Sequence, residues 1–216
     1  RNEVSFLDIF RKGSKTYFYS SLFFPKDVYR EVKVLYALVR TADDLVDGRQ
    51  ANIDKFNLFW EKYWGNEDKP SGDLIIDYFR QLVKKKKFEK DWICAFEKSM
   101  RMDFGKNKYT TLDETIEYMY GSAEVIGLMM CRIINIKNEA FPSARALGRS
   151  MQYANFMRDI DEDLGLGRVY FAEAEMKKVG LKSLNHQDVL KNEKGFVQFI
   201  NNQQKYYLEW LEEGRS

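Results

Sequence analysis

Apolar residues recur along most of this chain at intervals of three and four, the spacing of one face of an α-helix. The longest stripe covers 26–47 and consists of Val28, Val32, Leu35, Leu38, Val39, Ala42 and Val46. The same period predicts helices over 3–12, 52–64, 73–88, 90–103, 112–136, 140–164 and 194–213, with a surface loop at 65–72. Only three prolines interrupt the pattern. The sequence therefore predicts an all-α protein.

Composition bounds the size and class of the protein. The 216 residues are 44% hydrophobic and 31% charged, which is typical of a soluble chain with one sizeable core. We therefore expect a single domain over 1–216. Aromatic residues make up 15%, so an internal cavity would have aromatic walls. The net charge of +2 gives no reason to expect a nucleic-acid partner.

Cysteine and histidine usage narrows the chemistry further. Cys94 and Cys131 lie in apolar helical patterns, which predicts buried thiols and a reducing, cytoplasmic compartment. His186 is the only histidine, so histidine-based triads and His-rich metal sites are nearly excluded. The lysine run 84–87 is typical of a solvated face, with peripheral contact to an anionic membrane as the alternative.

The stretch 152–163, QYANFMRDIDED, concentrates negative charge on a predicted helix. Asp159 and Asp163 stand four apart on one face, where like charges repel. A solvated helix end is one interpretation of this stretch. A calcium loop is a second, but Leu164 and Tyr170 occupy the positions that require Gly and Glu. A magnesium site is the third, and it requires carboxylates from a second helix.

A second acidic pair lies at the end of the helix predicted over 26–47. Asp43 and Asp47 are again four apart, where the negative end of the helix dipole disfavours carboxylates. Magnesium ions bridging two such helices would relieve the repulsion and bind substrate phosphate oxygens. Arg40, Arg158 and Lys15 would hold the outer oxygens of a diphosphate. With an apolar interior beneath, this arrangement suits binding and ionisation of an allylic prenyl diphosphate.

The helix predicted over 112–136 is nearly all apolar and contains the small residues Gly121, Ser122, Ala123 and Gly127. Small residues leave room for close packing or for a bulky ligand, and packing is the commoner reason. Glu124 lies among them, and a buried carboxylate requires a partner. Arg101, Lys106 and Arg158 are its candidate partners.

Five motifs, in this order, resemble the squalene and phytoene synthase family of head-to-head prenyltransferases: SKTYFYS, ALVRTADDLVD, YGSAEVIG, NFMRDIDED and GRVYF. The resemblance runs from about residue 13 to 171. It implies an all-α isoprenoid-synthase fold with a central cavity and dependence on Mg²⁺. It also implies condensation of two identical prenyl diphosphates through a cyclopropylcarbinyl diphosphate.

The resemblance also assigns roles to individual residues. Metal binding falls on Asp43, Asp47, Asn155, Asp159 and Asp163. The catalytic set implied by the motifs is Asp43, Asp47, Asp159, Asp163, Tyr36 and Arg158. Substrate contacts fall on Ser14, Lys15, Thr16, Tyr17, Tyr36, Arg40, Tyr118, Ala123, Gly127, Gln152, Asn155, Arg158, Arg168 and Tyr170.

The chain departs from the family pattern at Glu124, where many members have Gly, and at Gly13, where some have His. The family continues for several more helices, so we expect this chain to be truncated at its C-terminus. RDIDED and GRVYF favour phytoene synthase, with geranylgeranyl diphosphate as substrate. Squalene or dehydrosqualene synthase, acting on farnesyl diphosphate, is the near alternative. A non-catalytic partner subunit is the alternative from another class.

Overall fold

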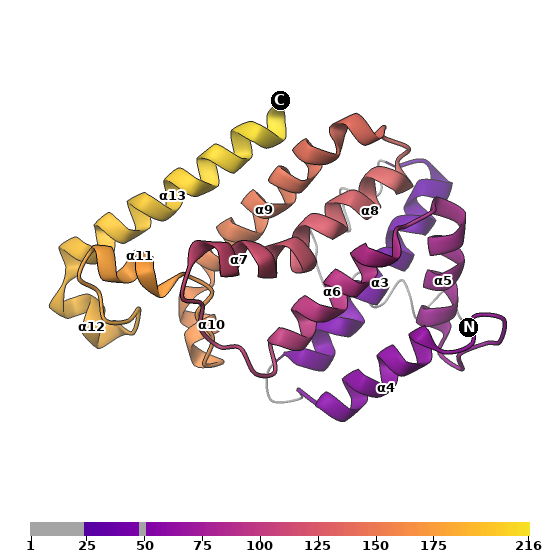
Figure 1. Cartoon of the computed structure of the whole chain (residues 1–216), viewed down its shortest axis with the longest axis horizontal. Coiled ribbons are helices and arrows are strands. Elements are labelled where there is room, and N and C mark those ends of the chain that lie inside the picture. Colours follow the sequence, from indigo (N-terminus) through magenta and orange to yellow (C-terminus); the bar gives the residue numbers. More distant parts are fainter. Residues whose placement is uncertain (1–23, 48–50) are drawn as a thin grey trace. The chain divides into compact units, whose positions relative to one another are not determined.

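The computed structural model describes residues 24–47 and 51–216, and all regular elements within them are helices (Figure 1). The only pairing of strand type there is one isolated bridge between Tyr109 and Ala172. The prediction of an all-α protein is confirmed. The helix expected over 3–12 and the candidate residues at 14–17 lie outside the described residues.

The described residues form two compact units. The first comprises 24–47, 51–90 and 129–136, and the second comprises 91–128 and 137–216. The expectation of a single domain over 1–216 concerns both units together and stays a prediction.

Three helices form most of the first unit: α3 (Lys26–Val46), α4 (Ile53–Trp64) and α5 (Leu74–Lys86). Each buries the apolar face that its sequence pattern predicts. Leu38 of α3, Phe56 and Trp60 of α4, and Ile76 and Phe79 of α5 are at most 1% exposed. Asn52 and Asp73 cap the first turns of α4 and α5 by accepting hydrogen bonds from backbone N–H groups. Side-chain burial on one face of each helix therefore builds this core.

Arg80 of α5 links its helix by hydrogen bonds to the end of α4 and to the loop that follows α4. It is 8% exposed, and its guanidinium donates to the carbonyl of Tyr63 from Nε at 3.1 Å and from Nη2 at 2.7 Å. It also donates to the carbonyls of Lys62, Gly65, Asn66 and Lys69. These carbonyls include ones at the C-terminal end of α4, which have no partner within the helix. Arg80, in the middle of α5, thus supplies the hydrogen-bond donors that the last carbonyls of α4 lack.

The second unit begins with α6 (Lys90–Met102), whose first residue belongs to the other unit. It continues with α7 (Leu112–Met119), the π-helix η2 (Tyr120–Glu124) and α8 (Val125–Ile133), of which residues 129–133 belong to the first unit. After the 3₁₀-helix η3 (Asn138–Ala140) come α9 (Phe141–Arg158) and α10 (Ile160–Gly165). The unit ends with α11 (Glu173–Lys178), α12 (His186–Lys191) and α13 (Glu193–Arg215).

α9 and α13 run side by side in opposite directions (Figure 1). At their contact the Tyr153 hydroxyl donates to Gln203 Oε1 at 2.6 Å, and Gln203 donates to the carbonyl of Phe199 at 3.2 Å. The Tyr153 ring meets Trp210 edge-on, with centroids 5.1 Å apart. A Cβ on Gly214 would lie within 3.0 Å of Leu147, so glycine lets the end of α13 approach α9 closely.

The helix predicted over 112–136 is interrupted by the five-residue π-helix η2. Glu124, at its end, is 0% exposed and accepts from Arg145 Nε at 2.8 Å and Arg149 Nε at 2.6 Å. The candidates Arg101, Lys106 and Arg158 are therefore not its partners in the structure. Arg145 also lies over the Tyr120 ring and Arg149 over Trp210. Both arginines come from α9, so the ion pairs join η2 to that helix.

Cys94 is exposed, so the prediction of two buried thiols is wrong for this residue and right for Cys131. The buried positions of α6 are Trp92, Ile93, Phe96, Ser99 and Met100. These follow the helical period, and Cys94 falls between them on the other face.

Arg80→Met should lower the free energy of unfolding by about 2–4 kcal/mol, because several buried carbonyls lose a charged donor. Urea unfolding followed by circular dichroism measures the change. Arg30→Met, at an exposed position of α3, is the matched control and should change stability by less than about 0.5 kcal/mol. Equal effects of the two substitutions would contradict the capping role of Arg80.

Glu124→Ala should cost about 2–4 kcal/mol, because a buried carboxylate with two arginine partners is removed. The comparison is Glu117→Ala, which breaks the exposed pair of Glu117 with Lys98 and should cost less than about 1 kcal/mol. If Glu124→Ala lowers the free energy of unfolding no more than Glu117→Ala does, the buried ion pairs of Glu124 stabilise the fold no more than an exposed pair.

Candidate active site

The first acidic segment lies at the end of α3, in the first unit. Tyr36, Arg40, Asp43 and Asp47 follow one another at helical spacing, so they share one stripe. Asp47 is the C-cap residue, and its N–H donates to the carbonyl of Asp43 at 2.9 Å. The last turn of α3 contains no basic residue, so the helix dipole and the carboxylates add their negative potentials there. Such a helix end favours a bound cation.

Arg40 pairs with Asp44 at 2.6 Å, one turn along α3. Both side chains are largely exposed, at 40% and 58%, so the pair contributes little to stability. It leaves Arg40 able to exchange Asp44 for another anion at low cost.

The second acidic segment lies in the second unit, where α9 ends and α10 begins. The two helices meet at Asp159, whose backbone (φ −102°, ψ 20°) leaves the helical region. The backbone bonds nevertheless continue across the break. Asp159 donates to the carbonyl of Asn155 at 2.9 Å, and Asp163 donates to that of Asp159 at 2.8 Å. The four-residue spacing expected for Asp159 and Asp163 is thus kept, although one helix over 140–164 was predicted.

Asp163 is the most perturbed carboxylate of this segment. Burial, followed by repulsion from the nearby charge of Asp159, raises the pKa of Asp163 to about 7, and Glu162 and Asp103 add to the effect. The positive charge of Arg168 opposes the rise. A cation bound beside Asp163 would oppose this rise and favour the ionised carboxylate.

Arg158 binds Asp159 through two hydrogen bonds, from Nε at 2.7 Å and from Nη2 at 2.6 Å. The hydrogen bonds and charge of Asp159 raise the pKa of Arg158. The Arg158 side chain is 70% exposed, so the pair is open to solvent and to an incoming anion.

Arg168 and Tyr170 lie on a short extended segment after α10. Arg168 N–H donates to the carbonyl of Asp163 at 2.8 Å, and Val169 N–H donates to that of Asn107 at 2.9 Å. The Thr115 hydroxyl donates to the carbonyl of Tyr170 at 2.8 Å. Arg168 and Tyr170 are buried, at 8% and 6% exposure. The structure therefore anchors this segment against both α7 and the acidic helix α10.

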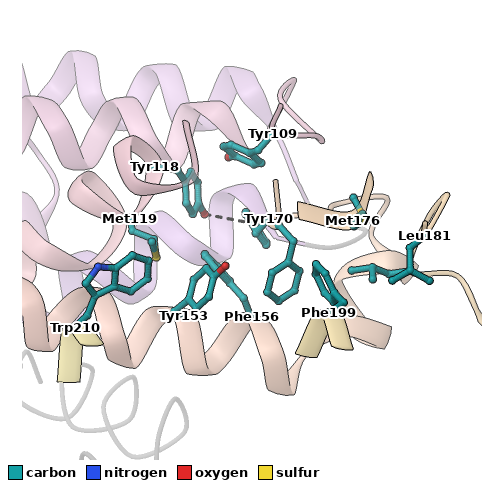
Figure 2. Packing of buried hydrophobic residues seen from close by; sticks show 12 residues of the cluster. Tyr109, Tyr118, Met119, Tyr153, Phe156, Tyr170, Met176, Leu181, Phe199 and Trp210 are labelled. Atoms are coloured by element: carbon teal, nitrogen blue, oxygen red, sulfur yellow. Dashed lines mark hydrogen bonds between the residues drawn. The ribbon is translucent and has the colours of Figure 1, made fainter. Parts of the chain in front are cut away.

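Tyr118 of α7 lies against Tyr170, with ring centroids 4.9 Å apart and hydroxyls joined by the dashed line in Figure 2. Phe156 of α9 stacks on Tyr170 at 4.4 Å with an interplanar angle of 9°. The structure thus brings together Tyr118, Tyr170, Arg168 and the acidic pair, all within the second unit.

Asp103, which no sequence motif indicated, accepts hydrogen bonds from the Tyr118 and Tyr170 hydroxyls at 2.9 Å each. It follows α6 directly, in a region interpreted as a helix end followed by a loop. The only available signal was an isolated carboxylate after the apolar residues of that helix.

Ala123 and Gly127 lie where the small-residue helix approaches α9. A Cβ on Gly127 would lie 2.9 Å from the carbonyl of Ala144, and one on Gly148 would lie 3.0 Å from that of Ala123. These contacts fit the close-packing interpretation of the small residues. Gln152 and Asn155 are half-buried on α9.

The carboxylates of Asp159 and Asp163 suit a magnesium site whose other ligands come from outside the protein. Within residues 24–47 and 51–216, no group of three or more His, Cys, Asp or Glu side chains is placed to hold a metal ion by itself. Asp159 and Asp163 supply two adjacent carboxylates, however, and Mg²⁺ commonly takes one or two carboxylates and fills its other positions with waters and phosphate oxygens. The arrangement fits an open site completed by substrate.

The lysine run 84–87 is only partly a solvated face. Lys85 and Lys86 both bind Glu31, at 2.8 Å and 2.9 Å, and Lys86 also donates to the carbonyl of Ile133 at 2.9 Å. Lys84 lies 3.7 Å from Glu67. In the described part of the chain, no helix combines the length and apolar character needed to cross a bilayer. Peripheral membrane contact stays a prediction.

Asp163→Asn should raise the unfolding temperature of the metal-free protein at pH 8 by roughly 2–5 °C. The folded pKa of about 7 exceeds the ordinary value of 3.8, so the native state holds an extra proton between these values. Wild-type stability should therefore fall relative to the variant as pH rises from about 4 to 7. Thermal unfolding in EDTA across this range measures it, with exposed Asp161→Asn as control. Parallel curves for wild type and Asp163→Asn would contradict the prediction.

Comparison with known proteins identifies relatives along most of the chain. A family model described as squalene/phytoene synthase matches residues 10–216. A chloroplastic phytoene synthase of Daucus carota is 31% identical over 186 residues, which cover 78% of this chain and 45% of that protein. A phytoene synthase of Thermus thermophilus is 31% identical over 170 residues, covering 76% of this chain and 57% of that one. The chain spans about half the length of the curated relatives it matches.

Solved structures share the fold. A squalene synthase, HpnC, of Alicyclobacillus acidocaldarius superposes with a TM-score of 0.82 at 21% identity, covering 98% of this chain and 81% of that one. A dehydrosqualene synthase solved in complex with a ligand gives 0.86 at 24% identity, covering 98% and 75%. Both likenesses support the isoprenoid-synthase fold that the motifs imply. The family match over 10–216 and the 31% identical relatives show that this chain belongs to the squalene/phytoene synthase family.

Proposed function

We propose that this protein is a magnesium-dependent prenyltransferase that joins two prenyl diphosphates head to head. Geranylgeranyl diphosphate is the proposed substrate and phytoene, formed through prephytoene diphosphate, the proposed product. The single observation that carries the proposal is the acidic segment, where backbone bonds keep Asp159 and Asp163 four residues apart, and where burial and the charge of Asp159 raise the pKa of Asp163. The names of the 31% identical relatives support phytoene as the product.

The reaction begins when the C1–O bond of one prenyl diphosphate breaks and the diphosphate leaves with the electron pair. Bound Mg²⁺ would supply the positive charge that stabilises this leaving group. Asp43 and Asp47 on one helix, and Asn155, Asp159 and Asp163 on the other, are the proposed ligands.

The basic residues have the complementary role. Arg40 and Arg158 each lie beside one of the acidic segments in a solvent-exposed ion pair. Exchange of the carboxylate partner for a diphosphate oxygen keeps a charge-assisted hydrogen bond at each guanidinium. We therefore assign both arginines to the diphosphate, together with Lys15, and Ser14, Thr16 and Tyr17 to the entrance for substrate.

The remaining residues hold and shield the hydrocarbon. Tyr36 and Gln152 are proposed to lie near the reacting carbons, with Arg168 and Tyr170 covering the site. Tyr118, Ala123 and Gly127 are proposed to line the path of the chain. Aromatic and apolar walls keep water from the allylic cation, which would otherwise be quenched to an alcohol.

Asp43→Asn and Asp159→Asn should each lower kcat by about 100-fold or more, because each removes a carboxylate that would hold the Mg²⁺ stabilising the departing diphosphate. The assay incubates the 216-residue chain with Mg²⁺ and radiolabelled geranylgeranyl or farnesyl diphosphate and identifies the product by its carbon number. Circular dichroism should show a folded protein in both variants, and Asp68→Asn, in an exposed loop, is the control.

Retained turnover in both variants would overturn the metal assignment. A C30 product made only from farnesyl diphosphate would replace phytoene by squalene or dehydrosqualene. Absence of any product from wild type with either substrate would overturn the proposed activity of this chain.

A further inference from the structure

Asp103 joins three parts of the second unit through one carboxylate. The residue directly follows α6, whereas Tyr118 belongs to α7 and Tyr170 to the segment after α10. The Tyr118 hydroxyl donates to Asp103 Oδ2 and the Tyr170 hydroxyl donates to Asp103 Oδ1, each at 2.9 Å. Each carboxylate oxygen thus receives one phenol, and 67 residues separate the ends of the longer link.

The direction of these two hydrogen bonds is fixed by chemistry. An ionised carboxylate only accepts, so both phenols must be the donors. Burial is the main cause that raises the pKa of Tyr118 and of Tyr170, which keeps both phenols protonated at neutral pH. The two hydroxyls lie 3.5 Å from one another, a longer contact than either makes with Asp103 (Figure 2). Each phenol has a single proton to donate, and each donates it in a hydrogen bond to Asp103.

A hydroxyl whose proton is committed can only accept further hydrogen bonds. The remaining lone pairs of the two oxygens are the negative ends of their dipoles. Donation to a carboxylate also polarises the phenol and increases the electron density of the oxygen and the ring. Both changes favour a neighbouring cation, through the oxygen dipole and through the ring face.

The pair lies next to the acidic segment. The Tyr170 ring stacks on Phe156 at 4.4 Å, and Phe156 precedes Asp159 by less than one turn on α9. The backbone N–H of Arg168, two residues before Tyr170, donates to the carbonyl of Asp163 at 2.8 Å. Tyr118 and Tyr170 are therefore close to the carboxylates that we assign to the leaving diphosphate.

We infer that Asp103 is a positioning residue for the reaction: it holds the Tyr118 and Tyr170 hydroxyls as a pair of acceptors that stabilises the allylic cation. The inference rests on the proposed function. The arrangement has a chemical advantage over a bare carboxylate, which would attack a carbocation and form an ester. The two phenols lie between Asp103 and the cation in this arrangement. The charge of Asp103 then stabilises the cation, while hydrogen bonds from the two tyrosines occupy the carboxylate oxygens.

Kinetics of Asp103→Asn provide the first test. The variant should lower kcat about ten- to hundred-fold, as loss of a residue supporting a reacting group commonly does. KM for the prenyl diphosphate should stay within about two-fold, because the diphosphate contacts are unchanged. In a Tyr118→Phe/Tyr170→Phe background, Asp103→Asn should have no further effect on kcat, because Asp103 acts through the two hydroxyls. Asp68→Asn is again the control.

Binding of a cation mimic provides a test that does not require turnover. The probe is an aliphatic tertiary ammonium with a prenyl-like chain, added with pyrophosphate and Mg²⁺, and its comparison is the isosteric neutral hydrocarbon. Asp103→Asn should lose about ten-fold affinity for the ammonium and none for the neutral compound. NMR of protein labelled at tyrosine Cζ should show two resonances that move in Asp103→Asn, assigned by Tyr118→Phe and Tyr170→Phe.

The outcomes separate the inference from the proposed function. Asp103→Asn with wild-type kcat and wild-type ammonium affinity overturns the inference alone, as does an equal loss for both probes, which indicates a structural role. If Asp103→Asn does not fold, the single tyrosine variants decide, and unchanged ammonium affinity in both overturns the inference. A wild-type protein that neither turns over prenyl diphosphates nor binds the ammonium overturns the proposed function and, with it, the inference.

Discussion

Repulsion between carboxylates is the interaction on which this molecule's proposed chemistry depends. Asp159 and Asp163 are held four residues apart by backbone bonds that continue across a helix break, so they cannot separate without unwinding α10. Asp43 and Asp47 lie at the negative end of α3 with no basic residue in its last turn. The helix dipole disfavours the pair on α3, and like-charge repulsion disfavours both pairs. A protein that retains both is suited to use them on a cation.

Contacts in the rest of the second unit hold the acidic segment in place despite the repulsion between Asp159 and Asp163. The aromatic group around Tyr170, the Tyr153–Gln203 bond and the contact of α9 with α13 together fix α9, which carries the acidic segment. Glu124 adds two ion pairs to the same helix. These contacts hold α9 on several sides next to the acidic segment, as a rigid scaffold commonly supports a strained local arrangement.

The sequence predicted the features that depend on local period. The stripe of α3, the apolar faces of α4 to α6 and the spacing of both acidic pairs follow from helical geometry alone, and the structure has them. The break at Asp159, the π-helix η2 and the short helix α12 were not predicted, because tertiary contacts decide helix continuity and short elements. The partners of the buried carboxylates could not be predicted from the sequence either. Glu124 pairs with Arg145 and Arg149, and Asp103 with two tyrosines distant in sequence, because packing brings these residues together.

The π-helix η2 has a geometric consequence for the rod formed by α7, η2 and α8. Its wider turns accommodate about one residue more than an α-helix of equal length, which offsets the following face by roughly 100°. Gly121 can therefore meet the carbonyl of Ala95 on α6 while Gly127 meets that of Ala144 on α9. If the same residues wound as a regular α-helix, each side chain after 124 would turn by about 100° relative to Gly121, and Gly127 would no longer face the carbonyl of Ala144. The rod's ability to contact two neighbours depends on its local irregularity, which a more uniform helix would lose.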